Sequence, residues 1–159
     1  MQLTKSARSV QAALDVKGLN CKVLELPNST RTAQDAAIAI GCNVAQIVKS
    51  LIFKTQSSNQ PVLILASGPN MVNELVIELH LKEKIIKADA SFSKEITGFA
   101  IGGIPPIGHQ QLIEHIFIDQ DLLRFNDIWA AAGTPNAVFN LKPSDLLTMT
   151  NGRVISIVQ

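Results

Sequence analysis

The chain has 159 residues, of which 47% are apolar and 17% charged, and its formal net charge is +1. This length and composition indicate a globular protein with a sizeable core, and the near-neutral charge argues against a protein that coats nucleic acid nonspecifically. No apolar run reaches the roughly 18 residues of a membrane span, and the N-terminus lacks the hydrophobic block of a secretory signal.

Apolar periodicity, capping residues and turn residues predict helices and strands that alternate without a regular rhythm. The predicted helices span residues 4–17, 33–40, 73–80, 91–97, 120–125 and 143–149. The predicted strands span residues 21–26, 47–54, 61–66, 84–88, 113–119, 127–132, 136–141 and 153–158. The second and third of these strands flank a hairpin-length loop, so we expect them to pair antiparallel. The order predicts an α+β fold, a single domain with a large mixed, mostly antiparallel β-sheet surrounded by helices.

One predicted strand, "IVKSLIFK" at residues 47–54, carries a lysine among apolar neighbours. Side chains alternate along a strand, so Lys49 shares its face with Ile47, Leu51 and Phe53. A buried ammonium without a partner is costly, so proteins usually avoid it or pair it. Two explanations stay open from the pattern: Lys49 lies at a sheet edge and extends to water over its neighbours, or it faces a binding pocket.

The loop "GGIPPIGH" at residues 102–109 combines three glycines that free the backbone with two prolines that stiffen it. Such a loop can bring peptide N–H and C=O groups close to a small ligand, although a rigid turn between strands would have the same composition. The segment "HLKEKIIK" at residues 80–87 is open to two interpretations as well. It forms a basic rim for phosphates or, because Glu83 dilutes its charge, an ordinary solvated surface.

Metal and cofactor motifs are missing from the sequence. The three histidines lack the spacing of a zinc site, and there is neither a G-x-S-x-G elbow nor a Walker A loop. We therefore expect no metal ion and no cofactor. Cys21 and Cys42 form no CxxC pair and no disulfide framework, which predicts a reducing, cytoplasmic location.

Four segments of the chain occur in the order "TAQDAAIAIG", "QIVKSLIFK", "GGIPPIG" and "AAGTPNAVFNLKPSDLL". In this order and spacing they resemble the YbaK/EbsC family, the free-standing relatives of the editing domain inserted in bacterial prolyl-tRNA synthetases. The resemblance implies one editing domain over residues 1–159 and a hydrolase that cleaves the ester of a mischarged tRNA. The implied partner is the acceptor end of tRNA(Pro) carrying a small wrong amino acid such as alanine or cysteine. Prolyl-tRNA synthetase is a second expected partner, whereas neither a membrane nor DNA is expected.

The resemblance also implies the residues of the site. A family lysine occupies the place of Lys49, so we expect its ammonium to be the catalytic group and to be compensated by the tRNA end. Ester hydrolysis builds negative charge on the carbonyl oxygen, and the backbone N–H groups of the loop Gly102–Gly108 are candidate donors to it. No general base stands out, and the family's chemistry uses a substrate hydroxyl or thiol, or an oriented water. We expect the substrate to contact Thr32, Gly102, Gly103, Ile104, Pro105, Pro106, Gly108, His109, Gly133 and Thr134.

Some positions depart from the family pattern. The cysteine-editing branch has Ser-Pro where this chain has Pro105-Pro106, and Ser-Gly-Gly where it has Ala132-Gly133-Thr134. The removed amino acid therefore stays open between cysteine, alanine and another small residue. His109 is not general to the family, and it either positions water or substrate or makes a structural hydrogen bond. An alternative function is a non-catalytic binding module that holds an aminoacyl or nucleotide ligand; a Schiff-base lysine enzyme ranks last, because no proton-transfer partner is visible.

Overall fold

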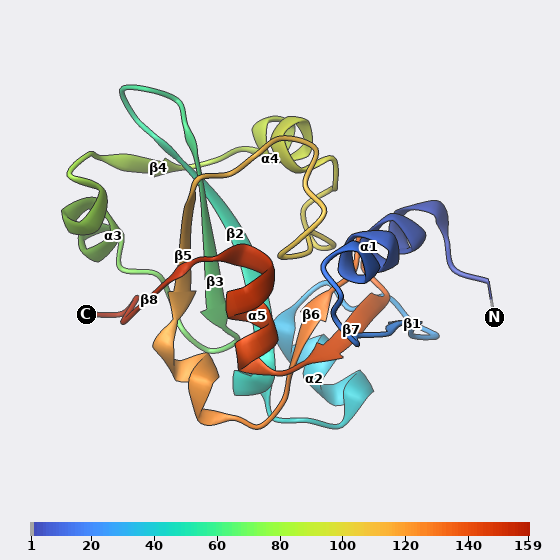
Figure 1. Cartoon of the computed structure of the whole chain (residues 1–159). Helices are drawn as coiled ribbons and strands as arrows, with labels where there is room; N and C mark the ends of the chain where they lie inside the picture. Colours follow the sequence, from blue (N-terminus) through green and yellow to red (C-terminus); the bar gives the residue numbers. More distant parts are fainter. Residues whose placement is uncertain (1) are drawn as a thin grey trace.

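The computed structural model describes residues 2–159, and one mixed sheet organises this part of the chain (Figure 1). The strands are β1 (Val23–Glu25), β2 (Ile47–Thr55), β3 (Pro61–Ser67), β4 (Ile85–Lys87), β5 (His115–Asp119), β6 (Ile128–Ala131), β7 (Ala137–Leu141) and β8 (Arg153–Ile155). The helices are α1 (Lys5–Val16), α2 (Ala33–Ile40), α3 (Glu74–Leu81), α4 (Ala90–Thr97) and α5 (Pro143–Thr150), with the 3-10 turns η1 (Val44–Gln46) and η2 (Gln120–Arg124). The strand order is β1-β7-β6-β2-β3-β5-β8, and β4 pairs with β2 outside this path.

The pairing of the strands mixes both directions. Antiparallel pairs join β1 to β7, β6 to β7, and β2 to both β3 and β4. Parallel pairs join β2 to β6, β3 to β5, and β5 to β8. The predicted α+β fold with a mixed, mostly antiparallel sheet surrounded by helices is confirmed, as is the β2–β3 hairpin. Within residues 2–159, no helix is long and apolar enough to cross a membrane.

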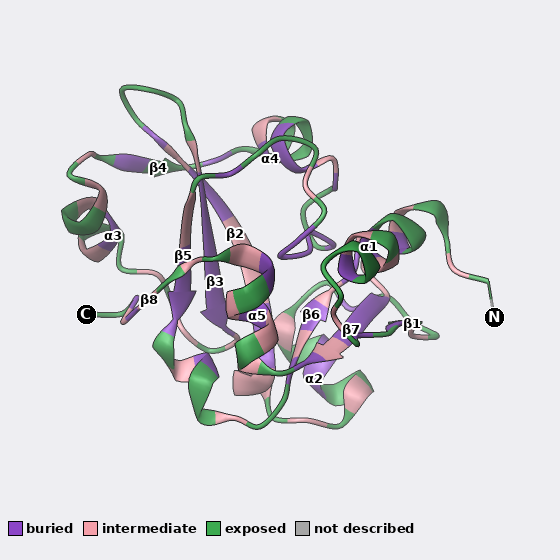
Figure 2. Cartoon of the chain, in the orientation of Figure 1, coloured by how far each residue is buried: buried purple, intermediate pink, exposed green. Residues whose placement is uncertain are grey.

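Helices cover both faces of the sheet, and β3 shows this most clearly because it is buried almost along its whole length (Figure 2). Leu63 and Leu65 point into the larger hydrophobic cluster, to which α1, α4 and α5 also contribute. Ile64 and Ala66 point into a second cluster, which contains Ile77 of α3. A strand that is buried on both faces needs apolar residues at successive positions, and "PVLILA" supplies them.

The helix α2 covers the beginning of β2. Their contact is a third, smaller cluster that includes Ala36 and Ile47. Leu51 and Phe53, which lie on the same face of β2 as Ile47, pack instead into the α3 cluster. Lys49 therefore stands on this face between the α2 cluster and the α3 cluster, where apolar packing is interrupted.

Some predicted elements differ from the structure. The short helix predicted at residues 120–125 is the 3-10 turn η2, and the Asp119 carboxylate caps it by accepting from the N–H of Asp121 at 3.0 Å. The predicted strand 21–26 is shorter in the structure. The Gln11 side chain accepts from Val23 N at 2.8 Å and donates to Cys21 O at 2.9 Å, so it takes the place of a strand partner there.

Candidate active site

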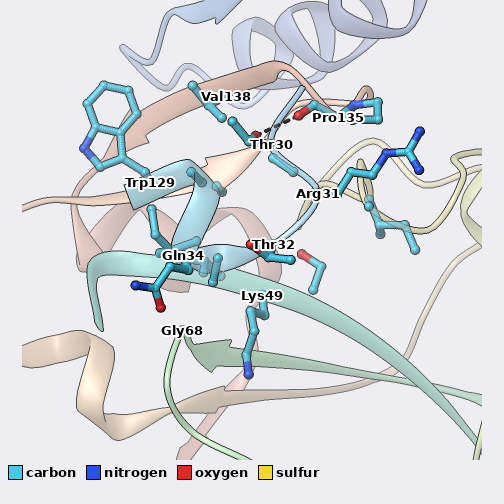
Figure 3. Close-up of a pocket in the computed structure, with 18 of the residues that line it drawn as sticks. Thr30, Arg31, Thr32, Gln34, Lys49, Gly68, Trp129, Pro135 and Val138 are labelled. Carbon is cyan, nitrogen blue, oxygen red and sulfur yellow. Dashed lines mark hydrogen bonds between the residues drawn. The ribbon is translucent and has the colours of Figure 1, made fainter. Parts of the chain in front are cut away.

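A cavity of about 490 Å³ lies beside the first half of β2 (Figure 3). Five segments far apart in the sequence form its walls, and most of its lining is apolar. The lining residues come from the segments 30–40, 44–51, 68–69, 101–104 and 129–138. Cavities of several hundred cubic ångströms with a few polar groups are typical binding sites for small ligands or for part of a larger one.

Lys49 lines this cavity and is half-buried. Its Nζ donates to the main-chain oxygen of Asn70 at 2.7 Å, and in Figure 3 the side chain points away from Thr32 toward the loop that follows Gly68. Burial lowers the pKa of the Lys49 ammonium below its usual range, and the nearby Asp119 carboxylate acts against that shift. β2 is an interior strand, although at Lys49 itself the strand pairing is with β3 alone, since β6 pairs with Ile47 and Val48 and β4 with Phe53–Thr55. Of the two explanations for Lys49, the structure agrees with the binding pocket, because the side chain lines the cavity and its ammonium is held by a main-chain oxygen.

The start of the glycine-proline loop reaches the cavity, where Gly102 and Ile104 line its wall. Gly103, between them, packs against another loop instead. A Cβ added at Gly103 would lie 2.9 Å from backbone atoms of Thr134, and Gly103 O accepts from Gly133 N at 2.8 Å. Gly103 and Gly133 thus fix the two cavity-lining loops to each other without reaching the cavity wall.

The second half of this loop packs away from the cavity. Pro105 and Pro106 are both buried, and His109 Nε2 donates to Pro105 O at 2.7 Å in the tautomer that carries a proton on this nitrogen. Burial lowers the pKa of His109, and its hydrogen bond to Pro105 O opposes this shift. Gly108 has a positive φ of 82° and faces Ala13 of α1. Of the two roles considered for His109, the structure contains the structural hydrogen bond.

The threonines expected at the site lie on the cavity wall. Thr32 accepts from Asp35 N at 3.0 Å as the N-cap of α2, and Thr134 donates to Asn136 Oδ1 at 3.0 Å. Both hydroxyl groups therefore position their loops as well as line the cavity. Thr30 lies beside them, and its hydroxyl donates to Pro135 O at 2.7 Å.

The sequence analysis missed several residues that line the cavity, among them Thr30, Arg31, Gln34, Trp129, Pro135 and Val138. Arg31 is exposed and lies in Figure 3 on the opposite side of the cavity from Trp129. The sequence signal for it was weak, because an arginine directly before an N-cap residue is as typical of a solvated surface as of a ligand contact. Trp129 gave no such signal, because its strand looks like ordinary apolar core.

The chemistry available to the cavity follows from its few polar groups. Among the described residues that line it, Lys49 and Arg31 carry charge, and none is an aspartate, glutamate or histidine. Across residues 2–159, no three or more His, Cys, Asp or Glu side chains are grouped to hold a metal ion. The arrangement supplies positive charge and hydrogen-bond donors to a ligand, and no side-chain carboxylate or imidazole to act as its base.

Comparison with known proteins identifies the family. Residues 27–149 match the aminoacyl-tRNA editing domain. The uncharacterized protein YwhH of Bacillus subtilis (strain 168) is 30% identical over 132 residues, which cover 83% of each chain. The chain belongs to the aminoacyl-tRNA editing domain family, which confirms the resemblance to the relatives of the prolyl-tRNA synthetase editing domain.

Two further relatives agree with this assignment. A proline–tRNA ligase of Limosilactobacillus fermentum is 30% identical over 95 residues, which are 57% of this chain and 16% of the ligase. A crystal structure provisionally described as a trans-editing enzyme for prolyl tRNA synthetase is 42% identical, covers 99% of both chains and superposes with a TM-score of 0.93. The ligase match is confined to a small part of that enzyme, whereas the crystal structure is similar to the whole chain.

Proposed function

We propose that this protein is a trans-acting aminoacyl-tRNA deacylase that hydrolyses the ester between a small wrong amino acid and the terminal ribose of tRNA(Pro). The observation that carries the proposal is a half-buried lysine on the wall of a cavity in a chain of the editing family. Two relatives support the choice of tRNA(Pro), since one is part of a proline–tRNA ligase and the other is described as acting in trans for prolyl-tRNA synthetase.

In this proposal, Lys49 stabilises the negative charge that develops on the ester carbonyl oxygen. One of its N–H groups is engaged with Asn70 O, which leaves the others for the substrate. The apolar lining lowers the local dielectric and strengthens this attraction. Gly103 N already donates to Ala100 O at 3.1 Å, so the main-chain donors proposed for the carbonyl are its neighbours Gly102 and Ile104.

The attacking group in this proposal comes from the substrate side. The cavity lining described above provides no carboxylate or imidazole base, which agrees with attack by an oriented water or by a hydroxyl or thiol of the substrate itself. Lys49 then acts by lowering the energy of the tetrahedral intermediate rather than by moving a proton.

The small size of the proposed amino acid follows from the limited ability of a synthetase to reject amino acids smaller than its own. A pocket shaped for proline rejects a slightly smaller amino acid by only about 1–3 kcal/mol per missing methylene, so a second site that destroys the smaller product is needed. We propose that the apolar part of the cavity accepts this small side chain. Arg31, exposed at the cavity, is proposed to meet a phosphate near the tRNA end.

The test is a deacylation assay with tRNA(Pro) charged separately with alanine, cysteine and proline. The proposal expects alanyl- or cysteinyl-tRNA(Pro) to lose its ester faster with the protein than without it, and faster than prolyl-tRNA(Pro) does. Alanyl-tRNA(Ala) serves as the control for tRNA selectivity. Ester loss at the uncatalysed rate for all three charged forms of tRNA(Pro) would contradict the proposal. Complex formation with prolyl-tRNA synthetase stays a prediction that a binding measurement on the two purified proteins would test.

A further inference from the structure

Asn70 joins the cavity lysine to two carboxylates. Its main-chain oxygen accepts from Lys49 Nζ at 2.7 Å. Its side-chain nitrogen donates to Asp119 Oδ2 at 2.8 Å and to Asp121 Oδ2 at 2.7 Å. An amide nitrogen has two N–H groups, so both donors of Asn70 are used by the carboxylates. The same residue therefore receives the lysine on its backbone and is anchored through its side chain.

Asp119 is the fixed end of this chain of hydrogen bonds. It lies at the end of β5 with 1% of its surface exposed, yet its oxygens accept from Ser67 N at 2.9 Å and from Asp121 N at 3.0 Å besides Asn70. A buried carboxylate is costly unless it is paired or well hydrogen-bonded. The three donors meet this need and hold the Asp119 side chain in one position.

The loop that carries Asn70 is fixed on its other side as well. A Cβ added at Gly68 would overlap Val44 O, so the loop lies directly on η1. The Ser67 hydroxyl donates to Ala45 O at 2.6 Å, and Asn70 N donates to Ser67 O at 2.9 Å. The Asn70 carbonyl therefore has little freedom to move relative to β2.

We propose that Asn70 is the positioning residue for the Lys49 ammonium, and that Asp119 and Asp121 hold Asn70 for this purpose. The inference rests on the proposed function, because Lys49 is the group that would meet the ester. The fixed carbonyl takes one N–H of the ammonium and thereby orients the remaining ones. The Asp119 carboxylate adds a negative charge near an ammonium that burial otherwise disfavours.

The activity test compares four variants in the deacylation assay. Asn70→Ala should lower kcat roughly 100-fold, the size expected for an ångström-scale misplacement of a catalytic group, with KM close to that of the wild type. Asp121→Ala should lower kcat in the same way, whereas Asp121→Asn keeps an acceptor oxygen for Asn70 and should stay within a few-fold of the wild type. Asn140→Ala is the matched control, because Asn140 also donates to a carboxylate, Asp127, at 2.9 Å, but does not contact Lys49.

A second readout does not depend on hydrolysis. The rate at which Lys49 is acetylated by acetic anhydride, followed by mass spectrometry across pH, reports the fraction of unprotonated amine. The charged groups connected to Lys49 are Asp119 at the end of β5, which acts on its ammonium directly, Asp121 in η2, which binds Asn70, and Arg31 before α2, which lines the same cavity. Asp119→Asn removes the negative charge that raises the pKa of Lys49, so half-maximal acetylation should move to lower pH in this variant and stay unchanged in Asn140→Ala.

Three results would overturn the inference: wild-type kcat for Asn70→Ala, equal losses for Asp121→Asn and Asp121→Ala, or a loss in Asn140→Ala as large as that in Asn70→Ala. If the wild type hydrolyses none of the charged tRNAs, the proposed function fails, and the acetylation profile decides this inference alone. An unshifted profile for a folded Asp119→Asn protein would then refute the coupling between Lys49 and the buried carboxylate.

Discussion

Replacing Gly103 with alanine should destabilise the protein and slow ester hydrolysis at the same time. The new Cβ would lie 2.9 Å from three backbone atoms of Thr134, where real Cβ contacts are longer, and backbone cannot rotate out of the way as a side chain can. Overpacking of this kind costs about 1–3 kcal/mol. Separating the loops also weakens the hydrogen bond from Gly133 N to Gly103 O, worth about 1 kcal/mol.

The expected total is a loss of about 2–4 kcal/mol in the free energy of unfolding, which for a chain of this size lowers Tm by roughly 4–16 °C. Since Gly102 and Ile104 line the cavity on either side of Gly103, a shift of about 1 Å should also slow deacylation by roughly 100-fold. Thermal unfolding followed by circular dichroism gives Tm, and the tRNA assay gives the rate. Ile101→Ala, an exposed change in the same loop, is the stability control and should stay within about 0.5 kcal/mol. A Gly103→Ala protein with the Tm and rate of the wild type would refute this account of the two loops.

Three further predictions concern single side chains. Burial lowers the pKa of His109 in the folded state, so below the ordinary histidine pKa of about 6.5 the unfolded chain binds more protons than the folded one. The free energy of unfolding should therefore fall as the pH drops below that value. Urea titrations across pH should show a shallower fall for His109→Gln than for the wild type. The buried hydroxyl of Ser50 has no hydrogen-bond partner among the described residues, so Ser50→Ala should raise stability by about 1 kcal/mol, and an unchanged or lower Tm would contradict this. Arg31→Gln should raise KM for charged tRNA and flatten its salt dependence while leaving kcat unchanged, and a change in kcat alone would exclude the phosphate contact.

The fold was largely predictable because the apolar pattern of its central hairpin is unambiguous. The strands expected at 47–54 and 61–66 are β2 (Ile47–Thr55) and β3 (Pro61–Ser67). Short edge elements were less predictable, since their hydrogen bonds come from side chains such as Gln11 rather than from strand neighbours. That residues 1–159 act as one domain in the cytoplasm stays a prediction.

The candidate site was predictable in part. Lys49, Thr32, Gly102, Ile104 and Thr134 all line one cavity. The remaining expected contacts lie outside the cavity lining. Glycine and proline reveal how free or stiff a loop is but not where its peptide groups point, so the sequence could not separate these residues from the true lining. The remaining expected contacts are Gly103, Pro105, Pro106, Gly108, His109 and Gly133.

The hydrogen bonds that hold Asn70 beside Lys49 could not be predicted from the sequence for a different reason. Asn70 lies 49 and 51 residues from its two carboxylate partners, and no local sequence pattern predicts a contact at that separation. Only the pairing of β3 with β5, which ends beside Asp119, brings the loop and the carboxylates together.

The most direct test of the central claim is the rate at which alanyl-tRNA(Pro) loses its ester with Lys49→Ala and with the wild type, each accompanied by a melting curve. Loss of one preorganised donor to a developing oxyanion slows acyl transfer by about 100- to 1,000-fold. The hydrogen-bond partner of Lys49 is a neutral carbonyl, so the protein should remain folded with a Tm close to that of the wild type. The account predicts a folded Lys49→Ala protein with at least that loss of rate, and a folded variant that deacylates as fast as the wild type would contradict it.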